Sequence, residues 1–226
     1  MTSIISGMTT EVIASLSTAR IASLTTEDIA AFSSDQFTVL STAQLRAIGT
    51  RQLSFLSADG LAGMTTDQVP ALSLPQVSAL TTLQIALLST DQLVALSTRE
   101  MTALTSRQLN TLNHLQVAAL ETDDLRALQT AQIATLGSSQ VAALTTDQLN
   151  SLATRQLVAL STGAIQALGV DQLTSLATAA MARLTSQQIN ALTAEQLALV
   201  STDQIAGLGT LQILSLIHIS EPTRPY

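Results

Sequence analysis

Every eighth residue from Met8 to Leu208 is a large apolar side chain, and the residue five places after each of them is also large and apolar. We number the positions of this eight-residue repeat, or octad, from 0 to 7, so that Leu88–Ala95 is one octad with Leu88 at position 0 and Leu93 at position 5. A fixed period is the signature of a repeat architecture, but eight residues match no familiar solenoid repeat. The octad therefore has to be interpreted from its own local chemistry.

The start of each octad carries the signals of a helix N-terminus. Position 1 is Ser or Thr in 17 of the 26 complete octads, and position 4 is Gln or Glu in 19 of them. Ser/Thr-x-x-Gln/Glu is the capping box, in which the hydroxyl and the Gln side chain each accept a backbone N–H of the other residue. The apolar residues at positions 0 and 5 then form a hydrophobic staple. The octad is thus predicted to be a short capped helix from about position 2 to position 7.

Some octads depart from this pattern in ways that predict weaker helices. Pro75 lies in a first helical turn and is tolerable there, whereas Pro70 at position 6 removes a backbone donor and should shorten its helix. Four position 1 residues are poorer caps, so that their helices should fray. They are Glu121, Gln129, Ala153 and Ala177.

Two other folds compete with short helices. One continuous helix is excluded, because eight residues at 100° each leave the apolar stripe about 80° further round in every octad. A β-solenoid is an alternative, since Ser, Thr, Ile and Val are plentiful and stacked coils could form Thr and Gln ladders. In a strand, however, position 0 would face the side opposite to positions 5 and 7. The sequence therefore favours helices.

We predict an all-α solenoid of short capped helices over residues 1–213, with a β-solenoid as the alternative. Positions 0 and 5 should form the continuous interior, positions 3 and 6 should face water, and the connections should be one or two residues long. Because a single octad buries little apolar surface, stability must come from stacking neighbouring octads, and the ends should be the weakest part. Neither end carries an obvious capping segment, so we expect the array to be a fragment of a longer one.

Composition excludes several classes of function. The net charge is −7, with no Lys, no Cys and 2% aromatic residues. An acidic chain without a basic stripe or interleaved aromatic residues is not typical of a nucleic-acid binder. The absence of Cys excludes disulfides and thiolate metal sites. Polar residues return in every octad, so we expect no membrane insertion.

Candidate chemical groups are few. His114 has no second ligand or base at a matching spacing, and we interpret it as a surface residue. Glu121-Thr122-Asp123-Asp124 is the densest acidic cluster, but it lacks the spacing of a calcium loop, and we interpret it as a solvated helix start. The Ser and Thr columns have no matching base. We therefore expect no enzyme activity, no cofactor and no catalytic, cofactor-binding or metal site.

The period ends in the tail, residues 214–226. Leu214–Arg224 reads Leu-Ser-Leu-Ile-His-Ile-Ser-Glu-Pro-Thr-Arg and closely resembles the in-frame translation of a transposase-based sequencing adapter. That resemblance implies that the tail is not native and that the natural chain continued past Ile213. His218 therefore supports no argument about metals or catalysis.

The octads themselves resemble a known group of repeat sequences. Strings such as Leu144-Thr145-Thr146-Asp147-Gln148-Leu149, repeated in tandem, are similar to uncharacterised octapeptide arrays in large adhesin-like bacterial surface proteins. The resemblance implies a non-enzymatic spacer or scaffold segment of a surface or secreted protein, whose partners are further repeats of the array and a protein or cell-surface partner. The alternatives are a partner-binding solenoid and a Thr-rich β-solenoid that binds ice or another surface.

Overall fold

A computed structural model describes the backbone of residues 3–220 and the side chains of residues 3–216. The described residues form short helices and no strand, so that the prediction of an all-α solenoid is confirmed and the β-solenoid alternative is wrong. The Thr-rich ice- or surface-binding alternative was tied to a β-solenoid and loses its structural basis with it. The chain divides into two compact units, unit 1 at Met1–Leu120 and unit 2 at Glu121–Tyr226.

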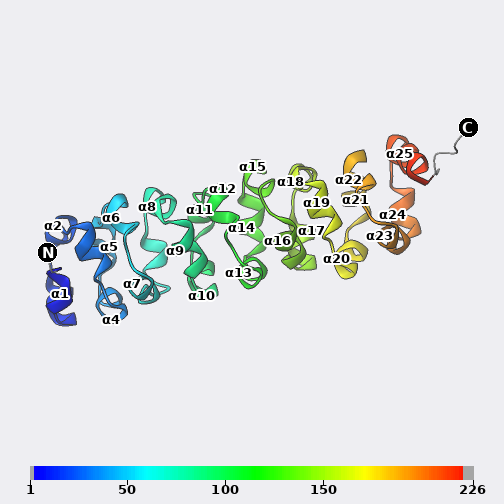
Figure 1. Cartoon of the computed structure of the whole chain (residues 1–226). Coiled ribbons are helices and arrows are strands. Elements are labelled where there is room, and N and C mark those ends of the chain that lie inside the picture. Colours follow the sequence, from blue (N-terminus) through cyan, green and yellow to red (C-terminus); the bar gives the residue numbers. More distant parts are fainter. Residues whose placement is uncertain (1–2, 221–226) are drawn as a thin grey trace, which may run out of the picture. The chain divides into compact units, whose positions relative to one another are not determined.

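The helices follow the octads one by one (Figure 1). Those of unit 1 are η1 (Ile5–Gly7), α1 (Thr10–Ser15), α2 (Thr18–Ala22), α3 (Thr26–Ala30), α4 (Ser34–Thr38), α5 (Thr42–Ala47), α6 (Thr50–Leu53), α7 (Ala58–Ala62), η2 (Val69–Ala71), α8 (Leu74–Ala79), α9 (Thr82–Leu87), α10 (Thr90–Val94), α11 (Thr98–Met101), α12 (Ser106–Leu109) and α13 (His114–Ala119). Those of unit 2 are α14 (Thr122–Ala127), α15 (Thr130–Ile133), α16 (Ser138–Ala143), α17 (Thr146–Ser151), α18 (Thr154–Ala159), α19 (Thr162–Gln166), α20 (Val170–Ser175), α21 (Thr178–Met181), α22 (Ser186–Asn190), α23 (Ala194–Leu199), α24 (Thr202–Ala206) and α25 (Thr210–Ser220).

Many helices begin with the predicted capping box. In α5, the Ser41 hydroxyl accepts from the Gln44 N–H at 3.2 Å, and the Gln44 Oε1 accepts from the Ser41 N–H at 2.7 Å. Residues 48 and 49 then lie in extended conformation between α5 and α6, at φ −68°, ψ 124° and φ −66°, ψ 152°. No described residue has a positive φ, so these connections need no special glycine. The prediction that connections are one or two residues long is wrong elsewhere: four residues separate α6 from α7 and α11 from α12, because α6 and α11 already end at position 5.

The predicted weak points are partly confirmed. The octad of Pro70 contains only the 3-10 helix η2, whereas the octad of Pro75 forms the full six-residue helix α8. Behind the poorer caps, α15 and α21 have four residues and α14 and α18 have six, whereas α11 and α12, behind Ser97 and Thr105, also have four. Helix length therefore does not follow the cap residue, and the fraying of these helices stays a prediction. In α18, the Gln156 Oε1 still accepts the Ala153 N–H at 2.8 Å, so half of the capping box persists without a cap side chain.

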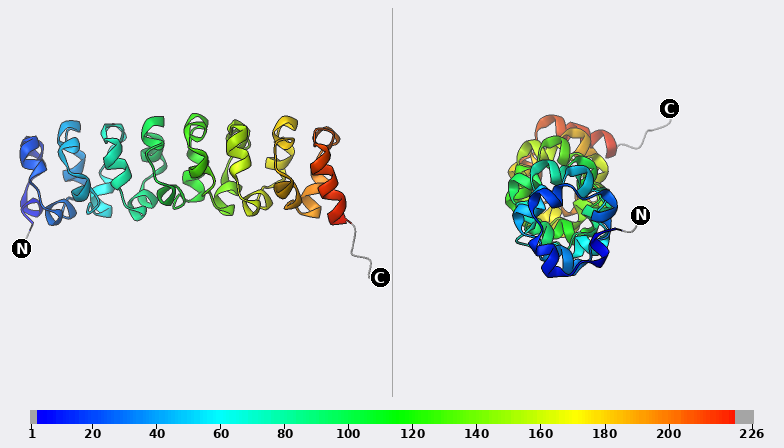
Figure 2. Two further views of the ribbon diagram at one scale, coloured as in Figure 1. Left: turned by 90° about the horizontal axis from the view of Figure 1, so that it is seen from above. Right: turned by 90° about the vertical axis from the view of Figure 1, so that its left-hand side faces the viewer.

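Within each unit the chain winds as a superhelix in which a helix packs against the third helix along the chain. Examples are α4 on α7 in unit 1 and α16 on α19 in unit 2. The stacked turns of unit 1 lie at the blue to green end of Figure 2. Side chains at positions 0 and 5 fill the interior, as predicted, and position 3 and 6 side chains are exposed or half-buried.

The tail differs from the octads, although residues 221–226 lie outside the described residues. Helix α25 has 11 residues and continues through residue 217. This residue stands at octad position 1, where other octads have their cap residue, but it is Ile217. A helix with no cap residue and no extended break at that point has no reason to end there.

Candidate functional site

The residues that join successive turns are the glutamines at position 4, which we call the glutamine ladder. The first ladder residue of unit 1 is Gln36, whose Nε2 donates to the carbonyls of Ile5 at 3.0 Å and Met8 at 2.8 Å. The two acceptors are 31 and 28 residues earlier in the chain. One turn of the superhelix therefore takes between three and four octads.

The same pair of bonds recurs along both units. In unit 1, Gln76 Nε2 donates to the Leu45 and Ile48 carbonyls, both at 2.9 Å. In unit 2, Gln204 Nε2 donates to the Leu173 carbonyl at 3.1 Å and the Leu176 carbonyl at 2.7 Å. Ladder residues whose Nε2 bonds lie within unit 1 are Gln36, Gln44, Gln52, Gln68, Gln76, Gln84, Gln92, Gln108 and Gln116, and those within unit 2 are Gln156, Gln172, Gln188, Gln196, Gln204 and Gln212.

Each ladder glutamine serves two helix ends at once. Its Oε1 accepts the backbone N–H of the N-cap residue that precedes its own helix, and its Nε2 donates to carbonyls at the C-terminus of a helix in the previous turn. Helix ends leave such backbone groups without intrahelical partners. A side chain with both an acceptor and two donors is required for this, and Gln is long enough to supply it. The capping half of this role is predicted by the sequence, whereas the second half and the burial of position 4 are seen only in the structure.

The first turn of unit 1 replaces this chemistry. Position 4 is Val12, Arg20 and Asp28 in the first three complete octads, and the first ladder glutamine is Gln36. Asp28 Oδ1 accepts the Ser3 hydroxyl and the Ile4 N–H, both at 3.0 Å, and Asp28 Oδ2 accepts the Thr25 N–H at 3.0 Å. The Asp28 carboxylate, which can only accept hydrogen bonds, thus pairs with a hydroxyl and a backbone N–H. The amide Nε2 of a later ladder glutamine such as Gln36 instead donates to backbone carbonyls.

The environment of Asp28 sets its ionisation. Burial raises the pKa of the Asp28 carboxyl, but the hydrogen bonds from Thr25, Ile4 and Ser3 outweigh burial and leave the pKa below its usual value. Hydrogen bonds to the charged form of a carboxyl lower its pKa in this way. Asp28 therefore remains ionised at neutral pH as the acceptor that closes the first turn.

The apolar residues of position 5 are covered unequally at the two ends. Ile5, Ile13, Ile21 and Ile29 are completely buried in the first turn of unit 1, at 0% exposure. In the last turn of unit 2, by contrast, Ile205 is 47% exposed and Ile213 is 39% exposed. The position 5 side chains are therefore covered by the turn that follows them.

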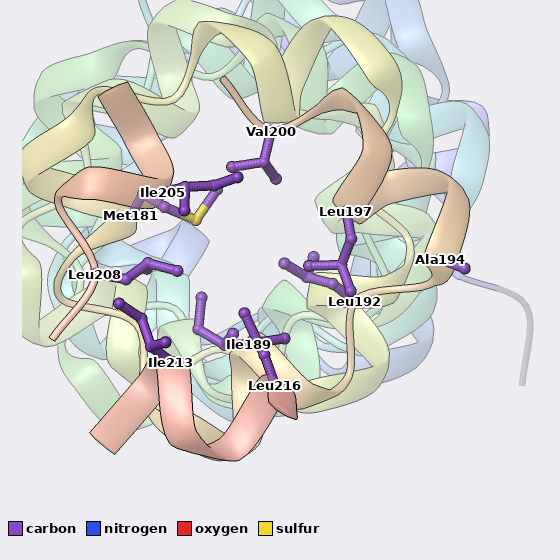
Figure 3. A pocket seen from close by; sticks show the side chains of 10 residues that line it. All are labelled: Met181, Ile189, Leu192, Ala194, Leu197, Val200, Ile205, Leu208, Ile213 and Leu216. Atoms are coloured by element: carbon purple, nitrogen blue, oxygen red, sulfur yellow. The ribbon is translucent and has the colours of Figure 1, made fainter. Parts of the chain in front are cut away.

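This last turn of unit 2 surrounds an apolar hollow of about 510 Å³. Figure 3 shows Ile205, Leu208, Ile213, Leu216 and Val200 pointing into it, with Ala194 at its outer edge. We call this surface the C-terminal face of unit 2 and define it by its lining residues. They are Met181, Ile189, Leu192, Ala194, Leu197, Val200, Ile205, Leu208, Ile213 and Leu216.

Unit 1 holds a second hollow, of about 540 Å³, where the ladder is interrupted. Glu100 replaces the ladder glutamine, is buried, and accepts the Ser97 N–H through Oε2 at 2.9 Å. Arg46 donates from Nε to the Ala71 carbonyl at 2.8 Å beside the 3-10 helix η2. Arg99 also lines this hollow. Two cations and a buried carboxyl therefore lie around the octad of unit 1 that contains η2.

The sequence candidates for a metal or catalytic site, His114 and the acidic cluster Glu121–Asp124, are placed as follows. His114 is exposed at the start of α13. In the acidic cluster Glu121 and Asp123 are exposed, but Asp124 is buried, so the interpretation of the whole cluster as a solvated helix start is wrong for Asp124. Within the described part of the chain, no group of three or more His, Cys, Asp or Glu residues could hold a metal ion. No described helix has the length and hydropathy needed to cross a membrane.

Comparison with known families agrees with this repeat organisation. Three segments of the chain, residues 5–42, 37–74 and 117–154, match the model of the ALTTAQ repeat. These segments, which together span just under half of the chain, are therefore similar to ALTTAQ repeats. The first two ALTTAQ segments include the start of the glutamine ladder at Gln36, Gln44 and Gln68. No curated protein matches the sequence.

Proposed function

We propose that this chain is a non-enzymatic spacer or scaffold segment of a larger bacterial surface or secreted protein, in which the number of octads sets the reach. The observation that carries the proposal is the glutamine ladder, since each turn bonds to the turn before it through one repeated contact. In such an array the free energy of unfolding is approximately the sum of the stabilities of the single repeats and of the contacts between neighbouring repeats. The number of octads can therefore change while the packing of the interior stays the same.

The outer surface supports the same proposal. Position 3, which is exposed or half-buried in every described octad, is Asp or Glu in 11 of the 26 complete octads, Arg in four and uncharged in the others, so that both signs of charge are interspersed along the chain. A surface that recognises one ligand along its length would instead repeat one residue type on one face. The surface-protein context comes from the resemblance of the octads to adhesin-like arrays.

Small-angle scattering on chains with different octad numbers tests this proposal. Deleting residues 129–160 removes four octads and keeps the repeat phase. We expect the maximum dimension to fall by the same increment for each equal deletion, with the helical circular dichroism per residue unchanged. A chain that keeps its dimension, or that loses its helical signal after one deletion, would contradict the spacer function.

A second candidate function is a partner-binding module, favoured by the hollow around Arg46, Arg99 and Glu100. Two guanidinium groups beside a proline-shortened octad could hold a carboxylate side chain of a peptide. Fluorescence anisotropy with a labelled Glu-rich peptide tests this candidate. Binding that is lost in an Arg46→Ala, Arg99→Ala double variant and kept in an Arg107→Ala control would support it, and absence of binding to the native chain would remove it.

A further inference from the structure

We infer that the C-terminal face of unit 2 is a docking surface for one further turn of octads with Gln at position 4, belonging to the same polypeptide. This inference deepens the proposed scaffold function and rests on it. Its starting point is that the face exposes position 5 side chains that are buried in every earlier turn described. Ile205 and Ile213 are 47% and 39% exposed, whereas Ile165 and Leu173 of the same unit are 0% exposed.

Three successive position 0 carbonyls of the last turn also lack an amide donor among the described residues, whereas the gaps earlier in unit 2, at Ala164 and Ala180, are single ones. In the described residues the carbonyls of Leu176 and Leu184, at position 0, each accept a ladder Nε2, from Gln204 at 2.7 Å and Gln212 at 2.5 Å. No side-chain amide of the described residues donates to the next position 0 carbonyls, those of Leu192, Val200 and Leu208. An occupant that supplies amide donors at this spacing would complete the pattern.

The ladder spacing says where those donors belong. Adding 28 residues to Leu192, Val200 and Leu208 gives positions 220, 228 and 236. The sequence has Ser220 at the first of these. A turn of octads with Gln at those three positions would donate to the open carbonyls and lay its own position 0 and 5 side chains over the exposed isoleucines.

A second copy of this chain is a poorer occupant. Its first turn presents Val12, Arg20 and Asp28 at position 4, none of which carries a side-chain amide. Asp28 is already engaged with Ser3 and Ile4, and its carboxylate would repel carbonyl oxygens. The chemistry of the two ends therefore favours growth of the array within one chain over head-to-tail association of copies.

The test is a chain in which residues 214–226 are replaced by a copy of residues 126–157, which restores the phase and contains Gln132, Gln140, Gln148 and Gln156. The matched control carries the same copy with these four glutamines changed to Glu. Glu keeps the oxygen that accepts the cap N–H and removes the amide donor. Both chains are compared with the native chain at neutral pH by hydrogen exchange and by binding of an apolar fluorescent dye.

We expect the glutamine extension to reduce dye binding and to raise hydrogen-exchange protection of the α23 and α24 amides by about tenfold, because these helices would no longer form the end of the unit. We expect the Glu control to show neither change. Equal effects of both extensions, or no effect of either, would overturn the inference. A dimer of the native chain that dissociates with a rise in dye binding would also overturn it, by showing a second copy as the occupant.

The outcome is separable from that of the scaffold proposal. If the extension covers the face but scattering shows no regular increment of length with octad number, the docking inference holds and the spacer function fails. If length increases regularly but the face remains exposed to dye, the reverse is true.

Discussion

The buried amide of Gln156 offers the sharpest test of the glutamine ladder. Gln156 is 0% exposed. Its Oε1 accepts the Ala153 N–H at 2.8 Å, and its Nε2 donates to the carbonyls of Leu125 and Leu128, both at 2.8 Å. All of these groups lie in unit 2. Replacing this one side chain therefore removes both the cap and the connection to the previous turn.

The expected cost follows from the groups left without partners. Gln156→Ala leaves the Ala153 N–H and the Leu125 and Leu128 carbonyls without the partner that they have in the native chain. Because each buried group without a partner costs about 1–3 kcal/mol, we expect the free energy of unfolding to fall by about 4 kcal/mol. Urea denaturation followed by far-ultraviolet circular dichroism measures this change.

Gln156→Glu separates the two halves of the role. The carboxylate still accepts the Ala153 N–H, but its second oxygen faces carbonyl oxygens in a buried site, which raises the pKa of the introduced carboxyl. An acid with a raised folded-state pKa causes no loss of stability below its unfolded pKa of about 4.3, and the loss grows as the pH rises above that value. We therefore expect the variant to be much less stable than the native chain at pH 7 and to recover most of the difference near pH 4.

The control is Gln187→Glu, at an exposed position 3 beside the ladder residue Gln188. We expect this change to stay within about 0.5 kcal/mol of the native stability at both pH values. The reasoning is refuted if Gln156→Glu unfolds at the same urea concentration as the control at pH 7, or if its deficit relative to the native chain is the same at pH 4 and pH 7.

Three further predictions address other parts of the fold. Ala180→Gln fills a gap in the ladder, where Nε2 could reach the Leu149 and Leu152 carbonyls, and should raise the free energy of unfolding by about 1 kcal/mol; a lower melting temperature would contradict it. Gly63→Ala should destabilise unit 1 by about 2 kcal/mol or more, because the added Cβ would lie 2.1 Å from the Ser34 carbonyl oxygen. The control Gly7→Ala, whose added Cβ meets nothing within 4 Å, should leave the melting temperature unchanged. The pKa of the Asp28 carboxyl is lowered in the folded chain, so the stability that Asp28 contributes is present above its unfolded pKa of about 3.9 and is lost as the pH falls through the lower folded value. Asp28→Asn should flatten this acid dependence when it is measured by hydrogen exchange of the α3 amides. An unchanged pH profile in the variant would contradict the role of Asp28.

Much of the fold could be predicted from the sequence because the octad states its own local structure. The apolar residues at positions 0 and 5, the cap at position 1 and the polar residue at position 4 together predict a short helix and its buried side. The shortening of the Pro70 octad to the 3-10 helix η2 follows from the missing backbone donor in the same way.

The connection between turns could not be predicted from one octad, because the capping box already explains the Gln at position 4. A glutamine that caps its own helix leaves its Nε2 free to point anywhere, and local chemistry does not fix how many octads make a turn. One signal was present in the sequence. The first three complete octads have Val12, Arg20 and Asp28 at position 4, and regular glutamines begin only at Gln36, where a previous turn can accept their amides.

The central claim, that buried glutamine amides join successive turns, is tested most directly by nuclear magnetic resonance of the Gln156 side chain. A long-range correlation through the hydrogen bond should connect Gln156 Nε2 with the carbonyl carbon of Leu128, 28 residues earlier, and the Nε2 protons should exchange slowly with water. Nε2 protons that exchange as fast as those of the exposed Gln187, with no correlation to Leu128, would contradict the account.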